Sequence, residues 1–231
     1  MLFRSSAQAL RSLDVDHADN PWSLDLHVAL ERWYFRGLQA GYGHPTDDQL
    51  APWTFDGRPV RVLAQPLLTA FLALHASYGL RDFRPLRAVE LVLVLRRDTA
   101  DGSLRWDALA ELLDRTGTAR FVYPAMELTE RWIPGTLGPD LRRQLDRAAT
   151  PRMRRVVNQV EADGLRLGHR SLDEKLMWAR GATELLGNLS ELVWSADDAM
   201  SAGDQLRVHL RRARMLVGQR VGVRAGGRGR R

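Results

Sequence analysis

The period of the hydrophobic pattern changes near residue 64 of this 231-residue chain. Upstream, short apolar runs alternate with polar residues, and Asp56-Gly57 supplies a hairpin turn within residues 54–63. Downstream, apolar residues recur every three or four positions, which is typical of amphipathic helices. The pattern therefore predicts an α+β protein, predominantly helical, with a small β-containing piece followed by a helical array.

Within the first part, residues 22–30 are predicted to form a strand that continues into a helix reaching Gly37. In the second part, a helix beginning at Pro85 carries the apolar residues Leu86, Val89 and Leu93. The β-branched residues that follow Leu86 would also fit a buried strand, and the proline favours the helix.

Caps and prolines mark the later helices. Pro139 and Pro151 fit first helical turns, and Thr150 is a good N-cap for the second of them. A capping box at Ser171 precedes a long helix predicted over residues 172–194. We expect four segments, which are a β-containing segment 1–63, a helical domain 64–150, C-terminal helices 151–218 and a disordered Gly/Arg tail 219–231.

Composition removes several classes of protein. The chain has no cysteine, which excludes disulfides, thiolate nucleophiles and cysteine zinc sites. Its most apolar window, residues 67–76, is half the roughly 20 residues that a membrane span needs, so we expect no membrane association. Without a signal-peptide pattern at the start, we expect a cytoplasmic protein.

The net charge of +6 belongs to the end of the chain, where nine arginines and no acid follow Asp204. Such a tail could contact nucleic-acid phosphates. It lacks interleaved aromatic residues, which argues against base stacking. Nucleic-acid binding is therefore the least favoured of the alternatives.

Asp25 and His27 are the first candidates for chemistry. They stand two residues apart in a predicted strand, so both belong to one face. A carboxylate beside an imidazole could hold a divalent metal or position a proton.

Several short elements around this strand follow one another in a characteristic order. They are Ser23-Leu24-Asp25-Leu26-His27, Gly57-Arg58-Pro59-Val60-Arg61-Val62-Leu63, Leu67-Leu68 through Leu74-His75-Ala76, and Arg105-Trp106-Asp107-Ala108-Leu109. Together they resemble the later part of the uncharacterised nucleotidyltransferase family, over about residues 20–140. The resemblance implies a nucleotidyltransferase fold, Mg²⁺ and a nucleoside triphosphate as cofactor and substrate, and Asp25 as the family's third metal-binding acid.

The family's Gly-Ser turn and Asp-x-Asp strand have no clear counterpart. No Gly-Ser precedes Asp25, because the first glycine is Gly37. Asp14-Val15-Asp16 matches Asp-x-Asp, but it leaves too little chain for a crossover between two parallel acidic strands, so a solvated loop is preferred. We expect a truncated or degenerate, catalytically incomplete relative.

His75 and Glu90 form a second candidate pair. His75 lies on an apolar helical stripe, where a histidine is more often a hydrogen-bonded core residue than a site. Glu90 lies in an apolar helix, where the family tends to have an acid, and burial would require a partner. The pair could be structural or part of a site. The alternative to a nucleotide-binding protein is a non-catalytic helical module that binds a partner protein.

Overall fold

The computed structural model describes residues 12–17, 20–27, 29–35, 38–78, 80, 85–160, 174 and 176–193. For residues 12–27, 35 and 190–193 it describes the backbone alone. Over these residues the chain is an α+β protein, predominantly helical, as the hydrophobic pattern predicts. The proposed boundaries of the four segments stay predictions, and the last helix and the tail lie outside the described residues.

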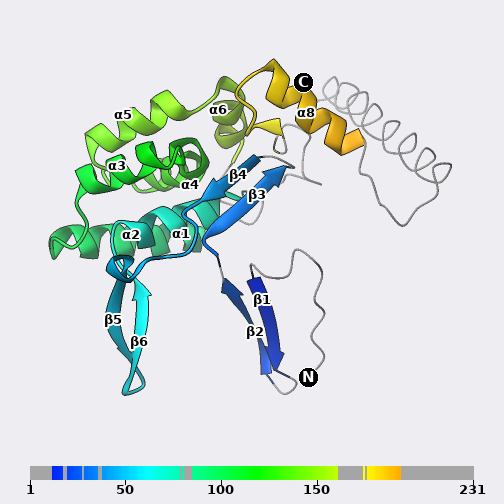
Figure 1. The fold of residues 1–231 in the computed structure, drawn as a ribbon. Helices are drawn as coiled ribbons and strands as arrows, with labels where there is room; N and C mark the ends of the chain where they lie inside the picture. The colour runs from blue at the N-terminus through cyan, green and yellow to red at the C-terminus, as the bar shows by residue number, and fades with distance from the viewer. Residues whose placement is uncertain are drawn as a thin grey trace, which may run out of the picture.

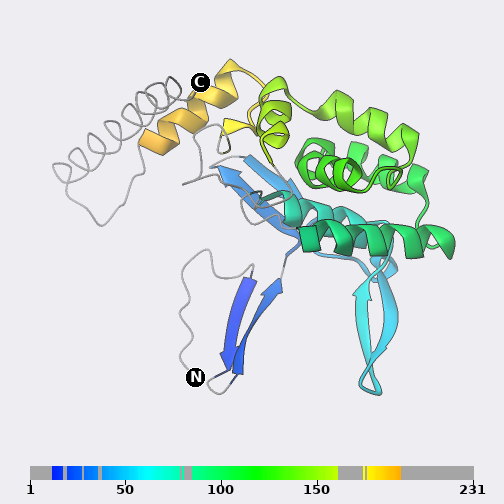
Figure 2. The ribbon, with the colours of Figure 1, turned by 180° about the vertical axis from the view of Figure 1, so that it is seen from behind.

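Three two-stranded antiparallel hairpins form the first part. Their strands are β1 (Ser12–His17) with β2 (Asn20–His27), β3 (Glu31–Phe35) with β4 (Leu38–Gly41), and β5 (Leu50–Phe55) with β6 (Arg58–Leu63), with a short 3₁₀ helix η1 (Asp47–Gln49) before β5. β3 contacts α1, whereas hairpins β1–β2 and β5–β6 both project from the lower side of the helical body (Figures 1 and 2).

The described residues of the second part form helices. They are α1 (Leu67–Tyr78), α2 (Pro85–Ala100), α3 (Trp106–Arg115), α4 (Ala119–Trp132), α5 (Pro139–Ala148), α6 (Pro151–Asn158) and α8 (Ala182–Val193). α4 contacts α1, α2, α5 and α6, and its Val122, Met126 and Leu128 are fully buried. The hydrophobic core therefore lies between α4 and its neighbours.

Pro124 interrupts the backbone hydrogen bonds of α4, because proline has no N–H. Ser77 of α1 fills the interruption. Its hydroxyl accepts a hydrogen bond from the Ala125 N–H at 2.9 Å and donates to the Val122 carbonyl at 3.4 Å. This exchange gives the Ala125 N–H a partner beside the proline and joins α1 to α4.

The proline and cap signals at the later helices are confirmed. α5 and α6 begin at Pro139 and Pro151, and the Thr150 hydroxyl accepts a hydrogen bond from the Met153 N–H at 3.1 Å. The prediction of one long helix over residues 172–194 is wrong in its middle. The chain leaves the helical conformation at residues 177–181, before α8 begins.

Two further predictions need correction. The expected helix reaching Gly37 is wrong, because Glu31–Phe35 and Leu38–Gly41 pair as strands. The helix at Pro85 is confirmed and the buried strand is wrong, but the residues that marked the helix face outwards. Leu86, Val89 and Leu93 are 65%, 41% and 63% exposed.

Candidate functional site

The backbone register of hairpin β1–β2 brings the acidic positions of the N-terminal segment together. Asp14 is the cross-strand partner of Asp25, Ser12 that of His27, and Asp16 that of Ser23. Because positions alternate between the two faces of a strand, all six belong to one face of the hairpin. Asp25 and His27 therefore share a face, as their spacing predicts, and Asp14 and Asp16 share it too.

This register removes the objection to Asp14 and Asp16 as a metal pair. The sequence disfavours them because a parallel crossover needs a dozen or more residues. The strands are antiparallel, and only residues 18 and 19 lie between them, so no crossover is needed. The predicted solvated loop is strand β1.

Asp14 and Asp25 occupy directly opposite positions of the hairpin, where two like charges carry an electrostatic cost for the strand pair. A divalent cation would offset this cost, and carboxylate oxygens are the donors that Mg²⁺ prefers. The donor chemistry at these positions thus fits a magnesium ion. Among the side chains that the structure describes, which begin at residue 29, no group of three acidic, histidine or cysteine residues could hold a metal.

The structure places His75 at a contact between strand β3 and helix α1. Arg32 of β3 donates a hydrogen bond to the His75 Nδ1 at 2.5 Å, and its guanidinium lies 5.6 Å from the Tyr78 ring centroid. Arginine can only donate, so Nδ1 accepts and carries no proton in this arrangement. His75 therefore joins strand β3 to helix α1.

Glu90 pairs with an arginine of its own helix. Arg87, three residues earlier on α2, donates a hydrogen bond to Glu90 Oε2 at 2.8 Å, and 44% of the Glu90 side chain is exposed. The structure thus gives His75 and Glu90 separate partners. Because Glu90 is exposed, it does not need the buried partner that the sequence suggested.

Sequence patterns missed a cluster of aromatic rings at the junction of β3, α1, α4 and the segment before α8. The Tyr34 ring centroid lies 5.4 Å from that of Tyr78, 4.6 Å from that of Phe121 and 4.3 Å from that of Trp178. Burial raises the pKa of Tyr34 well above its usual range. These four residues belong to separate elements, so no short motif could have indicated the cluster.

Arg120 closes one side of this cluster and is itself buried. It donates to the Trp178 carbonyl at 2.9 Å and to Glu184 Oε2 at 3.3 Å, and its guanidinium lies 4.5 Å from the Phe121 ring centroid. Burial lowers the pKa of Arg120, although Glu184 opposes the shift. Arg120 therefore fastens the segment around Trp178 and the first turn of α8 to α4.

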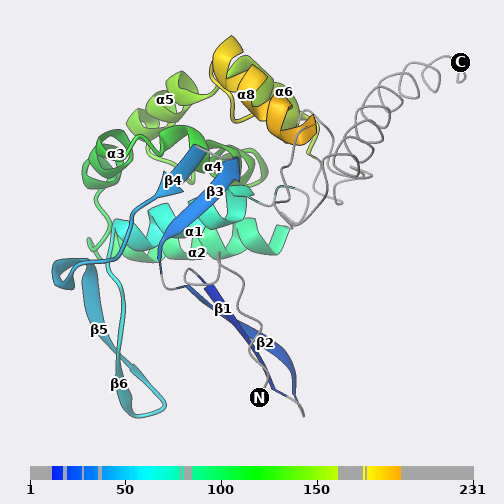
Figure 3. The same cartoon turned by 45° about the vertical axis from the view of Figure 1, so that its right-hand side comes forward.

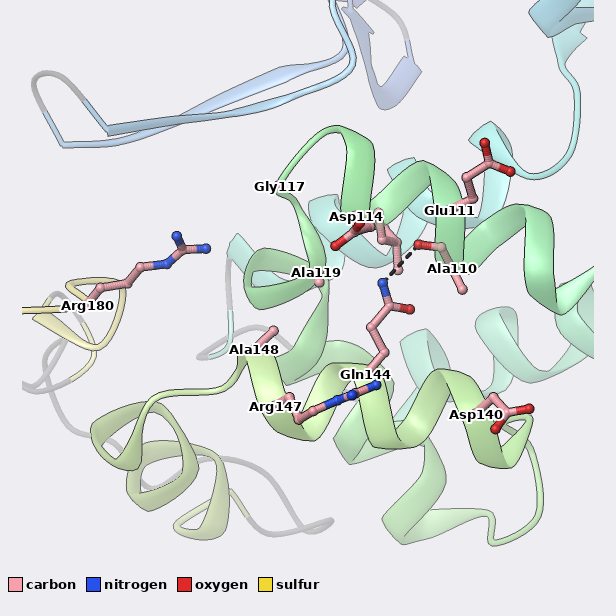
Figure 4. A pocket seen from close by; sticks show the side chains of 11 residues that line it. Ala110, Glu111, Asp114, Gly117, Ala119, Asp140, Gln144, Arg147, Ala148 and Arg180 are labelled. Atoms are coloured by element: carbon pink, nitrogen blue, oxygen red, sulfur yellow. Dashed lines mark hydrogen bonds between the residues drawn. The ribbon is translucent and has the colours of Figure 1, made fainter.

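A pocket of about 660 Å³ opens between α3, α5 and the start of α4 (Figure 4). Gln144 crosses its floor and donates a hydrogen bond to the Ala110 carbonyl at 2.9 Å. Its charged lining comprises Glu111, Asp114, Asp140, Arg147 and Arg180. Because both signs of charge line the pocket, its electrostatics favour neither an anionic nor a cationic ligand.

Comparison of the chain with protein-family models, curated proteins and solved structures found no match. None of the helices over the described residues has both the length and the apolar character needed to cross a membrane.

Proposed function

We propose that this is a nucleotidyltransferase-like protein whose β1–β2 hairpin binds a divalent metal. The observation that supports it best is the register in which Asp14 is the cross-strand partner of Asp25. The order of motifs over residues 20–140, which resembles the nucleotidyltransferase family, supports it independently.

Asp25 would be the principal metal ligand, with Asp14 and Asp16 beside it. His27, on the same face, would orient Asp25 by a hydrogen bond. A bound Mg²⁺ would stabilise the charge on the phosphate oxygens of a nucleoside triphosphate. Such a site would be formed by one hairpin, so it does not depend on the order of the helices.

The metal site alone does not supply a phosphate-holding turn. Since no Gly-Ser precedes Asp25, we expect no nucleotidyl transfer by this chain alone. The assay is transfer from ATP, CTP, GTP or UTP with Mg²⁺ or Mn²⁺. Transfer that disappears in Asp25→Ala would show that another part of the chain holds the phosphates, and would contradict catalytic incompleteness.

A helical interaction module is the second candidate, and the outward apolar stripe of α2 favours it. Leu86, Val89 and Leu93 are exposed along one side of that helix. A stoichiometric protein partner, together with no thermal shift from Mg²⁺-nucleotide, would favour this candidate over the first. The arginine-rich last helix and the tail, which the sequence also suggested as binding segments, lie outside the described residues.

A further inference from the structure

We propose that the pocket between α3, α5 and the start of α4 binds a small zwitterion. Such a molecule carries one ammonium and one carboxylate group, as a free amino acid or a short peptide does. The pocket volume of about 660 Å³ lies within the roughly 300–1,000 Å³ of typical small-molecule sites. Figures 1 and 3 show α3 and α5 side by side on the upper part of the helical body, whereas hairpin β1–β2 projects below it. The pocket is therefore separate from the proposed metal site.

Three charged side chains of the pocket belong to different walls. Asp114 lies near the end of α3, whereas Arg147 belongs to α5 and Arg180 to the segment before α8. Figure 4 shows the Arg180 side chain extending from that segment toward the end of α3 that carries Asp114. The pocket thus has a carboxylate on one side and two guanidinium groups on the others.

These three charges have no ion pair within the part of the chain that the structure describes. The Asp114 carboxylate has no acceptor role there, and the Arg147 guanidinium donates only to a backbone carbonyl of its own helix, at 3.3 Å. Glu184 accepts a hydrogen bond from the backbone N–H of Arg180 at 2.8 Å, and not from its guanidinium. All three charged groups are therefore available to a ligand.

The remaining two acids of the pocket are already paired. Glu111 lies 3.9 Å from Arg115, and Asp140 accepts a hydrogen bond from Arg143. A purely anionic ligand would meet the unpaired Asp114, and a purely cationic ligand would meet the two unpaired arginines. A zwitterion complements both sides, because its ammonium and its carboxylate lie at different ends.

The side chains match these two groups in chemistry as well as in charge. An ionised aspartate only accepts hydrogen bonds, so it suits the donors of an ammonium group. The planar fork of an arginine binds a carboxylate through two parallel hydrogen bonds. Small apolar side chains between the charged walls leave room for the carbon atoms of the ligand, and they are those of Ala110, Leu113, Ala119 and Ala148.

The test is isothermal titration calorimetry of the full chain with the common free amino acids, dialanine and trialanine. We expect at least one of them to bind with a dissociation constant of about 1 mM or tighter. The same molecule with its ammonium acetylated or its carboxylate amidated should bind at least about tenfold more weakly, because a charged hydrogen bond is lost. Comparison of the amino acids with the two peptides shows which kind of zwitterion fills the pocket.

Variants assign the two ends of the ligand. Asp114→Asn should weaken binding of the zwitterion at least about tenfold but leave binding of its acetylated form unchanged. Arg147→Gln combined with Arg180→Gln should do the same for the zwitterion and its amidated form. Asp140→Asn is the matched control, since this carboxylate lines the same pocket but is paired, and it should bind as the wild type does.

Three results would each overturn the proposal. They are a wild type that binds none of these molecules, an Asp114→Asn variant with unchanged affinity, and blocked derivatives that bind as tightly as the free zwitterion. These results are independent of metal binding at Asp25.

Discussion

Replacing Trp178 with alanine is expected to lower the free energy of unfolding by about 3–5 kcal/mol. The indole is 5% exposed, and its ring centroid lies 4.3 Å from that of Tyr34 and 5.6 Å from that of Phe121. Alanine would leave a cavity among rings that three other elements hold in place. Urea denaturation followed by circular dichroism measures the change.

The matched variants are Trp178→Phe, which keeps an aromatic ring in the cluster, and Leu186→Ala on α8, where the side chain is 66% exposed. We expect a smaller loss for the first and a change within about 0.5 kcal/mol for the second. Equal losses for Trp178→Ala and Leu186→Ala would contradict the role of Trp178 as the anchor of the segment before α8.

Glu130→Gln is expected to lower the free energy of unfolding by about 3 kcal/mol at neutral pH. The Glu130 carboxylate, 8% exposed, accepts hydrogen bonds from the backbone N–H groups of Gly135, Thr136 and Leu137 at 2.9–3.0 Å. The glutamine amide would lose the charge and place one N–H₂ group against those donors. Thermal and urea denaturation measure the loss.

The same contacts predict the pH dependence. Burial raises the pKa of Glu130, but the three backbone hydrogen bonds and Arg142 lower it more, so the net pKa lies below its usual value. A carboxyl with a lowered folded-state pKa stabilises the fold above its unfolded pKa and loses that contribution as the pH falls through the folded value. The difference between wild type and Glu130→Gln should therefore shrink below about pH 4.

Glu127→Gln is the control on the same helix. Glu127 pairs with Arg131 at 3.5 Å with spacing i,i+4, so its loss should cost no more than about 0.5 kcal/mol. A Glu127→Gln variant as unstable as Glu130→Gln would show that the backbone contacts of Glu130 contribute little.

The parts of the fold that the sequence predicted are those decided by local chemistry. Pro139, Pro151 and Thr150 mark the starts of α5 and α6, because a ring-locked φ and a side-chain cap act within one turn. The Asp56-Gly57 turn likewise lies between β5 and β6. In each case the determining contacts lie within a few residues.

What the sequence could not predict depends on distant partners. α2 has apolar residues on both sides, and its packing against α1 and α4 decides that Ala88, Leu91 and Leu95 are buried. Glu31–Phe35 and Leu38–Gly41 become strands because they pair with each other. Periodicity cannot choose between such outcomes, since it carries no information on which neighbour covers which face.

The candidate metal site shows the same limit. The two-residue spacing of Asp25 and His27, which is local, predicts that they share a face. The sequence disfavours Asp14, because the short separation leaves too little chain for a crossover between two parallel acidic strands. The cross-strand pairing that brings it beside Asp25 follows from the antiparallel register, which spacing alone does not determine.

Metal binding to the β1–β2 hairpin is the central claim, and titration with Mn²⁺ followed by electron paramagnetic resonance tests it most directly. We expect the wild type to bind Mn²⁺ and Asp25→Asn and Asp14→Asn each to weaken binding at least about tenfold. Asp56→Asn, at the β5–β6 turn, is the matched control and should bind as the wild type does, since asparagine tolerates its φ of 48°. A wild type that does not bind Mn²⁺, or an Asp25→Asn variant with unchanged affinity, would contradict the account.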